Sequence, residues 1–286
     1  MKNGLVLEGG GFRGLFTSAV LDVMMERGIR FDGLVGVSAG ALFGVNFKSH
    51  QIGRGLRYNL RFKDTPEYMG WRALLATGNI VGPRFAYHVV PFELDPVDAE
   101  TFRTDPTEFW AVCTDIVSGG PVYHQLTEIT HESIEWLRAS ASMPLVSTPV
   151  ALDGRLLLDG GMVDSIPLEA FQRMGYERNV VILTQPAGFR KQHTGRNWLF
   201  RTVYRKYPLV ASIMERRHEM YNRQLDLLAE AEKNGEVLVI RPDEPLDIGR
   251  TETNGIRMQA VYAAGLAIAR RMMERVESCF YVFDFQ

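Results

Sequence analysis

Two stretches near the N-terminus decide the fold, LVLEGGGFRG at residues 5–14 and LVGVSAG at residues 34–40. Each begins with a short aliphatic run that is typical of a buried strand, and each then turns through glycines into a segment with helical spacing. Strands that alternate with helices in this way form a mostly parallel sheet. The sequence therefore predicts a three-layer α/β/α fold, in which helices cover a mostly parallel central sheet.

The rest of the chain continues this alternation of strands and helices. Further strands are expected at 109–116, 122–126, 155–158, 180–184 and 237–240, and further helices at about 130–141, 164–174, 197–231 and 255–277. The segment 50–105 contains four prolines, so we expect a less regular surface connection or lid there. No repeat or linker divides the chain. We expect one domain over residues 1–286, with a motif-bearing core at about 4–185 and a C-terminal helical extension at about 190–286.

Composition limits the class of protein. The chain has 286 residues, of which 46% are hydrophobic and 23% charged, and this excludes disordered, collagen-like and coiled-coil proteins. Lysine and arginine number 32 against 34 acidic residues, for a formal net charge of -2. This balance argues against nucleic acid as a partner.

The cysteines and the apolar runs bear on the compartment. Cys113 and Cys279 are too few for a disulfide framework, so we expect two buried thiols in a reducing compartment. Glu8 interrupts the only N-terminal apolar run, which is therefore no signal peptide. The apolar stretch at 260–269 is shorter than the ~20 residues that span a bilayer. We expect a cytoplasmic protein.

The glycine loop at residues 9–14 is suited to binding an anion. It follows a strand and opens a helix, so its backbone N–H groups can face a phosphate or an oxyanion. Its spacing fits a dinucleotide-binding loop, but the second strand ends in Val37 and Ser38 instead of the acidic residue that binds ribose. Leu15 and Phe16 replace the lysine and the serine or threonine of a phosphate-binding P-loop. An oxyanion site and a tight structural turn remain as interpretations.

Residues 36–40 match the pattern G-x-S-x-G. The pattern stands between a strand and a helix, the context in which it forms a nucleophile elbow. Gly36 and Gly40 allow the sharp turn, which lifts Ser38 out of the sheet at the N-terminus of a helix. We therefore expect Ser38 to be a catalytic nucleophile.

A serine nucleophile needs a base that accepts its proton. None of the six histidines lies in a motif that marks it as this base, and none has the spacing of a zinc helix, so we expect no metal. Asp159 ends an apolar strand, and its carboxylate reaches Ser38 if the two strand ends are neighbours. Desolvation raises the pKa of such a carboxylate toward a useful value. The alternative is a β-turn, for which Asp-Gly is a common dipeptide.

The glycine loop, the elbow and Asp159-Gly160-Gly161, in this order, resemble the patatin-like phospholipase family. These proteins are lipid acyl hydrolases with a Ser–Asp dyad, and bacterial members resemble this chain most. The segment ASMP at residues 141–144 also resembles a part of that family. The resemblance covers roughly residues 4–185 and implies a patatin-like domain.

Carried over by position, the resemblance implies Ser38 as the nucleophile and Asp159 as its general base. It implies an oxyanion hole formed by backbone amides of the glycine loop, and removal of one such donor typically costs about 3–4 kcal/mol in the barrier. The amides are those of Gly10, Gly11 and Phe12. The supporting motif positions are Gly9, Arg13, Gly14, Gly36, Gly40, Gly160 and Gly161.

The implied reaction is acyl transfer from a lipid or another acyl ester, with no metal or organic cofactor. Three alternatives stay open. An acyltransferase and a small-ester esterase would use the same dyad, whereas a non-catalytic lipid-binding protein would keep only the fold. The sequence indicates neither the oligomeric state nor the lipid headgroup.

The segment 178–214 contains no acidic residue and seven basic ones, with five aromatic residues among them. The basic residues are Arg178, Arg190, Lys191, Arg196, Arg201, Arg205 and Lys206. One interpretation is peripheral contact with anionic lipid headgroups, to which each basic residue contributes about 1 kcal/mol. The other is a solvated helix face whose aromatic side chains pack on the core.

Overall fold

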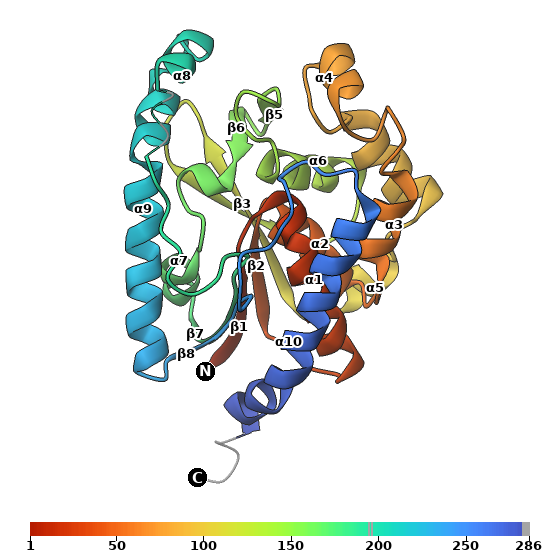
Figure 1. Cartoon of the computed structure of the whole chain (residues 1–286), viewed down its shortest axis with the longest axis vertical. Coiled ribbons are helices and arrows are strands. Elements are labelled where there is room, and N and C mark those ends of the chain that lie inside the picture. Colours follow the sequence, from red (N-terminus) through yellow and green to blue (C-terminus); the bar gives the residue numbers. More distant parts are fainter. Residues whose placement is uncertain (194, 196, 282–286) are drawn as a thin grey trace.

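The structure is a computed structural model that describes residues 1–193, 195 and 197–281, with side chains as far as residue 278. Its centre is a sheet in the order β5-β6-β3-β2-β1-β7-β8, with β4 also paired to β3 (Figure 1). The strands are β1 (Lys2–Leu7), β2 (Gly33–Val37), β3 (Glu108–Asp115), β4 (Pro121–Leu126), β5 (Val150–Leu152), β6 (Arg155–Asp159), β7 (Tyr176–Ile182) and β8 (Val237–Ile240). The strands β3, β2, β1, β7 and β8 are parallel, which confirms the predicted sheet.

Helices cover both faces of this sheet. They are α1 (Gly14–Glu26), α2 (Ala39–Lys48), α3 (Arg54–Phe62), α4 (Trp71–Thr77), α5 (Ala99–Thr104), α6 (His131–Ser140), α7 (Leu168–Arg173), α8 (Asn197–Val203), α9 (Pro208–Lys233) and α10 (Gly255–Tyr281). Alternating residues of β1 point to opposite faces. Leu5 and Leu7 pack with residues of α1, α2 and α10, whereas Val6 packs with residues of α7 and α9 (Figure 1). The predicted three layers are confirmed.

The segment 50–105 is more regular than predicted. It contains α3, α4, α5 and a π-helix (Phe85–Leu94). Arg54 joins these elements to α2, because its buried guanidinium donates to the carboxylate of Asp95 at 3.1 Å and to the amide oxygen of Asn46 at 2.8 Å. The segment is therefore an ordered wall packed beside α2.

The predicted helix at 197–231 is two helices in the structure. The first, α8, ends at Val203, and the second, α9, begins at Pro208. Proline has no backbone N–H to continue a preceding helix, but it suits the first turn of a new one. The short strand β5, which pairs antiparallel with β6, was not predicted.

Two expectations about the whole chain are tested only in part. No helix in the described ranges is long and apolar enough to cross a bilayer. Cys113 is a buried free thiol, as expected, and the side chain of Cys279 lies outside the described part of the chain.

Candidate active site

Two strands run toward each other along one edge of β3 and meet there. The last residue of β2, Val37, lies opposite Val112. The strand β6 runs antiparallel to β3, and its last residue, Asp159, lies opposite Cys113. Because β4 occupies the other edge of β3, both strands share one edge, and Ser38 and Asp159 lie where the two strands meet.

Ser38 occupies the sharp turn between β2 and α2. Its backbone has φ 55° and ψ -123°, a strained region that residues other than glycine rarely adopt. The turn has no room for a side chain at Gly36, where an added Cβ would lie 2.5 Å from the amide nitrogen of Ala41. The N–H of Ser38 donates to the hydroxyl of Ser140 at 2.9 Å, and that hydroxyl donates to the carbonyl of Val112 at 2.7 Å. The turn is thereby tied to β3.

Asp159 is a buried carboxylate at the end of β6. The amide of Gly161 donates to its Oδ1 at 2.7 Å, and the side chain of Ser38 lies close enough to the carboxylate to lower its pKa. Burial raises the pKa of Asp159 more than the nearby Ser38 side chain, the charge of Arg217 and the Gly161 amide lower it. A carboxylate whose pKa is raised is a better base than an ordinary aspartate, and this one lies beside a serine.

The glycine loop packs directly on Ser38. An added Cβ at Gly9 would lie 2.9 Å from the Cβ of Ser38. Within the described ranges, the amides of Gly10 and Gly11 have no hydrogen-bond acceptor, so they are free to donate to a ligand oxygen. The amide of Phe12 differs, because it donates to a backbone carbonyl in the segment before α10 at 3.4 Å.

The remaining motif residues hold the loop, the elbow and the aspartate turn close together. An added Cβ would lie 2.8 Å from a neighbouring side chain at Gly14, and nearer still to backbone atoms at Gly40 and Gly160. The side chain of Arg13 lies beside the loop, where burial lowers its pKa and the negative charge of Glu8 opposes this.

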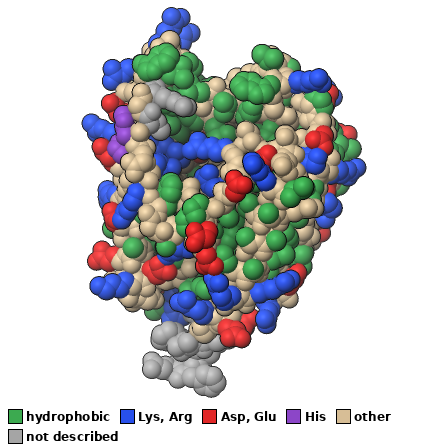
Figure 2. Space-filling view, in the orientation of Figure 1, with side chains coloured by type: hydrophobic (Ala, Val, Ile, Leu, Met, Phe, Trp, Pro, Cys, Tyr) green, Lys and Arg blue, Asp and Glu red, His purple; other side chains and the backbone are tan. Residues whose placement is uncertain are grey.

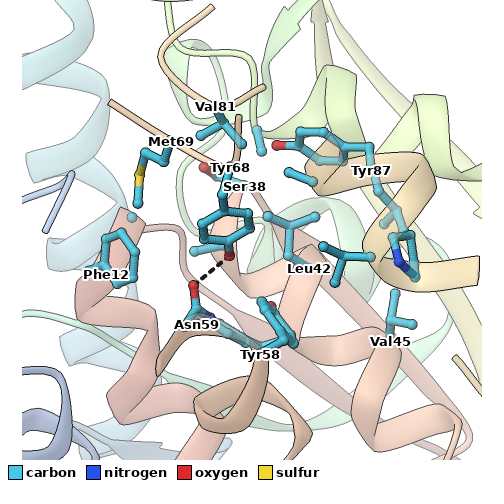
Figure 3. A pocket seen from close by; sticks show the side chains of 18 of the residues that line it. Phe12, Ser38, Leu42, Val45, Tyr58, Asn59, Tyr68, Met69, Val81 and Tyr87 are labelled. Atoms are coloured by element: carbon cyan, nitrogen blue, oxygen red, sulfur yellow. Dashed lines mark hydrogen bonds between the residues drawn. The ribbon is translucent and has the colours of Figure 1, made fainter. Parts of the chain in front are cut away.

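An apolar cavity of about 150 Å³ opens beside Ser38. Ser38, Leu42 and Val45 line it in the i, i+4, i+7 spacing of one face of α2 (Figure 3). The opposite wall comes from the segment between α2 and α5 and includes Tyr68 and Tyr87. The hydroxyl of Tyr68 donates to an asparagine side chain at 2.7 Å. Because this hydroxyl already has a hydrogen-bond partner, the wall contributes mainly apolar aromatic surface to the cavity.

No histidine lies at this site. None of the six, all of which the structure describes, lines the cavity. His88, for example, contacts His131 at 2.9 Å and Glu135 at 2.8 Å, away from Ser38. Among the described residues, no group of three histidine, cysteine, aspartate or glutamate side chains is placed to hold a metal ion.

Three residues that contact this site were not predicted from the sequence. Ser140 bridges the elbow to β3, and Arg217 donates from Nε to the carbonyl of Gly161 at 2.5 Å. Arg250 lies against the glycine loop, with its carbonyl 2.5 Å from an added Cβ at Gly11. Ser140 directly precedes the ASMP segment, which offered a signal for it, whereas nothing in the sequence distinguishes the two arginines from surface residues.

Two family models match the chain. One, described as patatin-like phospholipase, matches residues 5–171, and the other, a domain of unknown function (DUF6363), matches residues 207–281. The solved structure of VipD from Legionella pneumophila aligns with 96% of this chain and 67% of its own, at 13% identity and a TM-score of 0.46.

Several curated proteins are similar in sequence. The uncharacterised protein YjjU of Escherichia coli is 30% identical over 189 residues, which are 64% of this chain and 52% of that protein. An uncharacterised NTE family protein of Mycobacterium tuberculosis, Rv1063c, is 28% identical over 70% of this chain and 55% of its own length. Lysophospholipase NTE1 of Scheffersomyces stipitis is 26% identical over 94% of this chain and 18% of its own length. The chain therefore spans about half the length of the first two relatives and less than a fifth of the third.

The bridge through Ser140 gives a first test of the site. Ser140→Ala leaves the N–H of Ser38 without its acceptor, and we expect the free energy of unfolding to fall by about 1–3 kcal/mol. We also expect slower reaction of Ser38 with a fluorophosphonate, because the strained turn relaxes. Ser142→Ala is the control, since the Ser142 hydroxyl donates only to a helix carbonyl, that of Arg138. Equal effects of the two variants in both measurements would contradict this role of Ser140.

Proposed function

The chain belongs to the patatin-like phospholipase family, and from this premise we propose that it is a serine-dependent lipid acyl hydrolase of the phospholipase or lysophospholipase type. One observation carries the proposal most directly. Ser38 lies beside the buried carboxylate of Asp159, where β2 and β6 meet, and it lines an apolar cavity. A nucleophile, a base and a space for an acyl chain are the parts that ester hydrolysis by this route needs.

In the proposed reaction, Asp159 accepts the proton of Ser38 as its Oγ attacks the ester carbonyl. The negative charge that forms on the carbonyl oxygen is stabilised by the amides of Gly10 and Gly11, which are preorganised and need not rotate. The proton on Asp159 passes to the leaving alcohol as the ester C–O bond breaks. Water then loses a proton to Asp159, attacks the acyl-enzyme and releases the fatty acid, and that proton returns to Ser38.

An acyltransferase or a small-ester esterase would use the same geometry. The acyl acceptor, water or another alcohol, distinguishes a hydrolase from an acyltransferase, and the length of the substrate's acyl chain distinguishes a lipid hydrolase from a small-ester esterase. The apolar cavity favours a substrate with a hydrocarbon chain over a small ester. The strained backbone at Ser38 lowers the stability of the fold. A non-catalytic lipid-binding protein would gain nothing in return for this strain, whereas an enzyme gains a positioned nucleophile. We therefore favour lipid hydrolysis.

We further propose that residues 1–286 form one patatin-like domain. The motif-bearing core lies at about 4–185, and the C-terminal extension from about residue 190 completes it. Two contacts support this view, since β8 pairs with β7 at the sheet edge and α10 packs along α1.

The basic segment 178–214 supports a proposal of peripheral membrane contact only in part. Phe200 and Tyr204 are buried, as the core-packing interpretation expected. Arg190 and Arg201 are paired with acidic residues of α9. Arg196 lies outside the described residues.

Exposed apolar side chains give the stronger argument for membrane contact. Trp198 is 68% exposed on α8, and Trp71 and Leu75 are 75% and 86% exposed on α4. Figure 1 shows α8 and α4 at the same end of the molecule, and Figure 2 shows hydrophobic side chains on both sides of a hollow there. Tryptophan favours the boundary between lipid and water, so we propose that this end rests on a bilayer.

The base gives a pH-dependent prediction. Only the ionised form of Asp159 accepts a proton, and its pKa is raised. We therefore expect kcat/KM on a soluble ester to be highest above that raised pKa and to fall as the pH drops through it, at a pH above the usual ~3.9 of an aspartate. Asp159→Asn should lower kcat at least about a hundredfold. A pH profile that is flat down to the ordinary aspartate range, or full activity of Asp159→Asn, would contradict the proposed base.

The cavity predicts acyl-chain selectivity. Val45 lies two turns of α2 from Ser38, about 10 Å along the helix. Val45→Trp should shorten the cavity and lower the ratio of long-chain to butyryl ester hydrolysis by about tenfold, whereas Val45→Ala should not lower it. Assays with p-nitrophenyl esters of two chain lengths measure this ratio. An unchanged ratio in Val45→Trp would mean that the chain lies elsewhere.

Membrane contact is tested by vesicle flotation. The double variant Trp71→Ser/Trp198→Ser should bind phosphatidylserine-containing vesicles more weakly than the native protein. The matched variant Trp71→Phe/Trp198→Phe, which keeps aromatic rings at both positions, should retain most of the binding. Equal binding by the serine and phenylalanine variants, or no binding by the native protein, would refute contact through this end.

A further inference from the structure

Four basic side chains lie near one another beside the glycine loop and α9. We call them the cationic cluster, and they are Arg13, Lys191, Arg217 and Arg250. Arg217 belongs to α9, while Lys191 and Arg250 come from the segments before α8 and before α10. Figure 2 shows basic side chains gathered in the hollow at this place, between α9 and the centre of the molecule.

The cluster contacts both halves of the candidate active site. Arg217 donates to the carbonyl of Gly161, whose own amide donates to Asp159. The backbone of Arg250 lies against Gly11, and Arg250 lines the apolar cavity together with Ser38. A molecule whose ester lies at Ser38 therefore has the cluster beside it.

Acidic side chains do not balance the positive charge of the cationic cluster. Glu8 is the acid among the four cations, but its carboxylate is already bonded to neutral donors, the Thr184 amide at 2.6 Å and the Tyr221 hydroxyl at 2.6 Å. In the described part of the chain, none of the four basic side chains forms an ion pair within 4.0 Å. When Lys191 is protonated and Glu8 and Asp159 are ionised, the four cations leave a surplus of two positive charges, and a bound anion would favour this protonated state of Lys191.

The side chains are held in place and partly removed from water. The Nζ of Lys191 lies 4.1 Å from the ring centre of Tyr221, and the Asn222 side chain pins the Lys191 backbone with bonds of 2.9 and 3.0 Å. The Nε of Arg13 is buried with no hydrogen-bond partner. Burial, followed by the positive charge of Arg217, lowers the pKa of Lys191 to about 7. Crowded and partly buried cations raise the electrostatic free energy of the protein, and an anion bound between them offsets this increase.

We propose that the cationic cluster binds the phosphate group of a phospholipid or lysophospholipid whose acyl ester lies at Ser38. The inference rests on the proposed hydrolase function and names its substrate class. In such a lipid the ester and the phosphate are carried by the same glycerol, so the acyl chain enters the apolar cavity and the phosphate faces α9. Arginine and lysine are the side chains that bind phosphate oxygens, and a surplus of two charges suits a phosphomonoester dianion best.

Substrate selectivity gives the first arm of the test. Three substrates share one acyl chain and are used below the concentration at which they aggregate: lysophosphatidic acid, lysophosphatidylcholine and monoacylglycerol. We expect kcat/KM to fall in this order, with at least about a tenfold difference between the first and the last. Lys191→Met and Arg250→Met should each lower that ratio several-fold. Arg216→Met, an exposed position on α9 outside the cluster, should leave it unchanged.

Binding without turnover gives the second arm, which separates a lipid headgroup from free phosphate. Calorimetry on Ser38→Ala measures the affinity for inorganic phosphate and for lysophosphatidic acid, with and without Lys191→Met. We expect lysophosphatidic acid to bind more tightly than inorganic phosphate and Lys191→Met to weaken it about tenfold. Binding of inorganic phosphate alone, with no preference for the anionic lipid, would overturn the headgroup assignment.

The two arms also separate this inference from the proposed function. If the native protein hydrolyses all three lipids equally and the variants change nothing, the hydrolase stands and the phosphate site is wrong. If it hydrolyses none of them, the proposed function fails, and calorimetry alone decides for or against the phosphate site.

Discussion

The arrangement of the candidate site depends on one constraint, the sharing of a single edge of β3 by two strands that run in opposite directions. Since β2 ends opposite Val112 and β6 ends opposite Cys113, the residues that leave these strands must meet. Hydrogen bonds fix both ends to β3, because the Thr114 hydroxyl donates to the carbonyl of Asp159 at 2.8 Å and Ser140 links Val112 to the elbow. The serine and the carboxylate are therefore juxtaposed by sheet pairing, and flexible loops play little part in it.

Two opposite environments flank this meeting point. On the side of α2 and α3, the apolar cavity offers space to hydrocarbon and has few charges. On the side of α9, the cationic cluster lies beside the buried Glu8. An ester bound between them would have its acyl part and its polar part drawn to different walls, and this contrast would orient the substrate before any chemistry occurs.

Much of this architecture could be predicted from the sequence because it is encoded locally. The buried strand runs, the glycine turns and the G-x-S-x-G elbow each occupy fewer than about a dozen consecutive residues, and their periodicity and turn chemistry identify them. The pairing of β6 with β3 beside β2 joins segments far apart in the sequence, and no local pattern encodes it. The proximity of Asp159 to Ser38 could therefore be predicted only on the condition that these strand ends are neighbours. Lys191, Arg217 and Arg250 come together only in three dimensions. From the sequence, Lys191 was considered only as part of a basic segment, either membrane-facing or solvated, whereas its ammonium lies over the ring of Tyr221, which is hydrogen-bonded to Glu8. The break before α9 was missed although Pro208 marks it.

Covalent labelling shows whether Asp159 makes Ser38 reactive. Native protein, Ser38→Ala and Asp159→Asn would be treated with a fluorophosphonate and mapped by peptide mass spectrometry, after unfolding curves have verified that the variants fold. We expect one label on Ser38, its absence from Ser38→Ala and a sharply slower rate in Asp159→Asn. An unlabelled native protein, a label on another residue, or an undiminished rate in Asp159→Asn would contradict it.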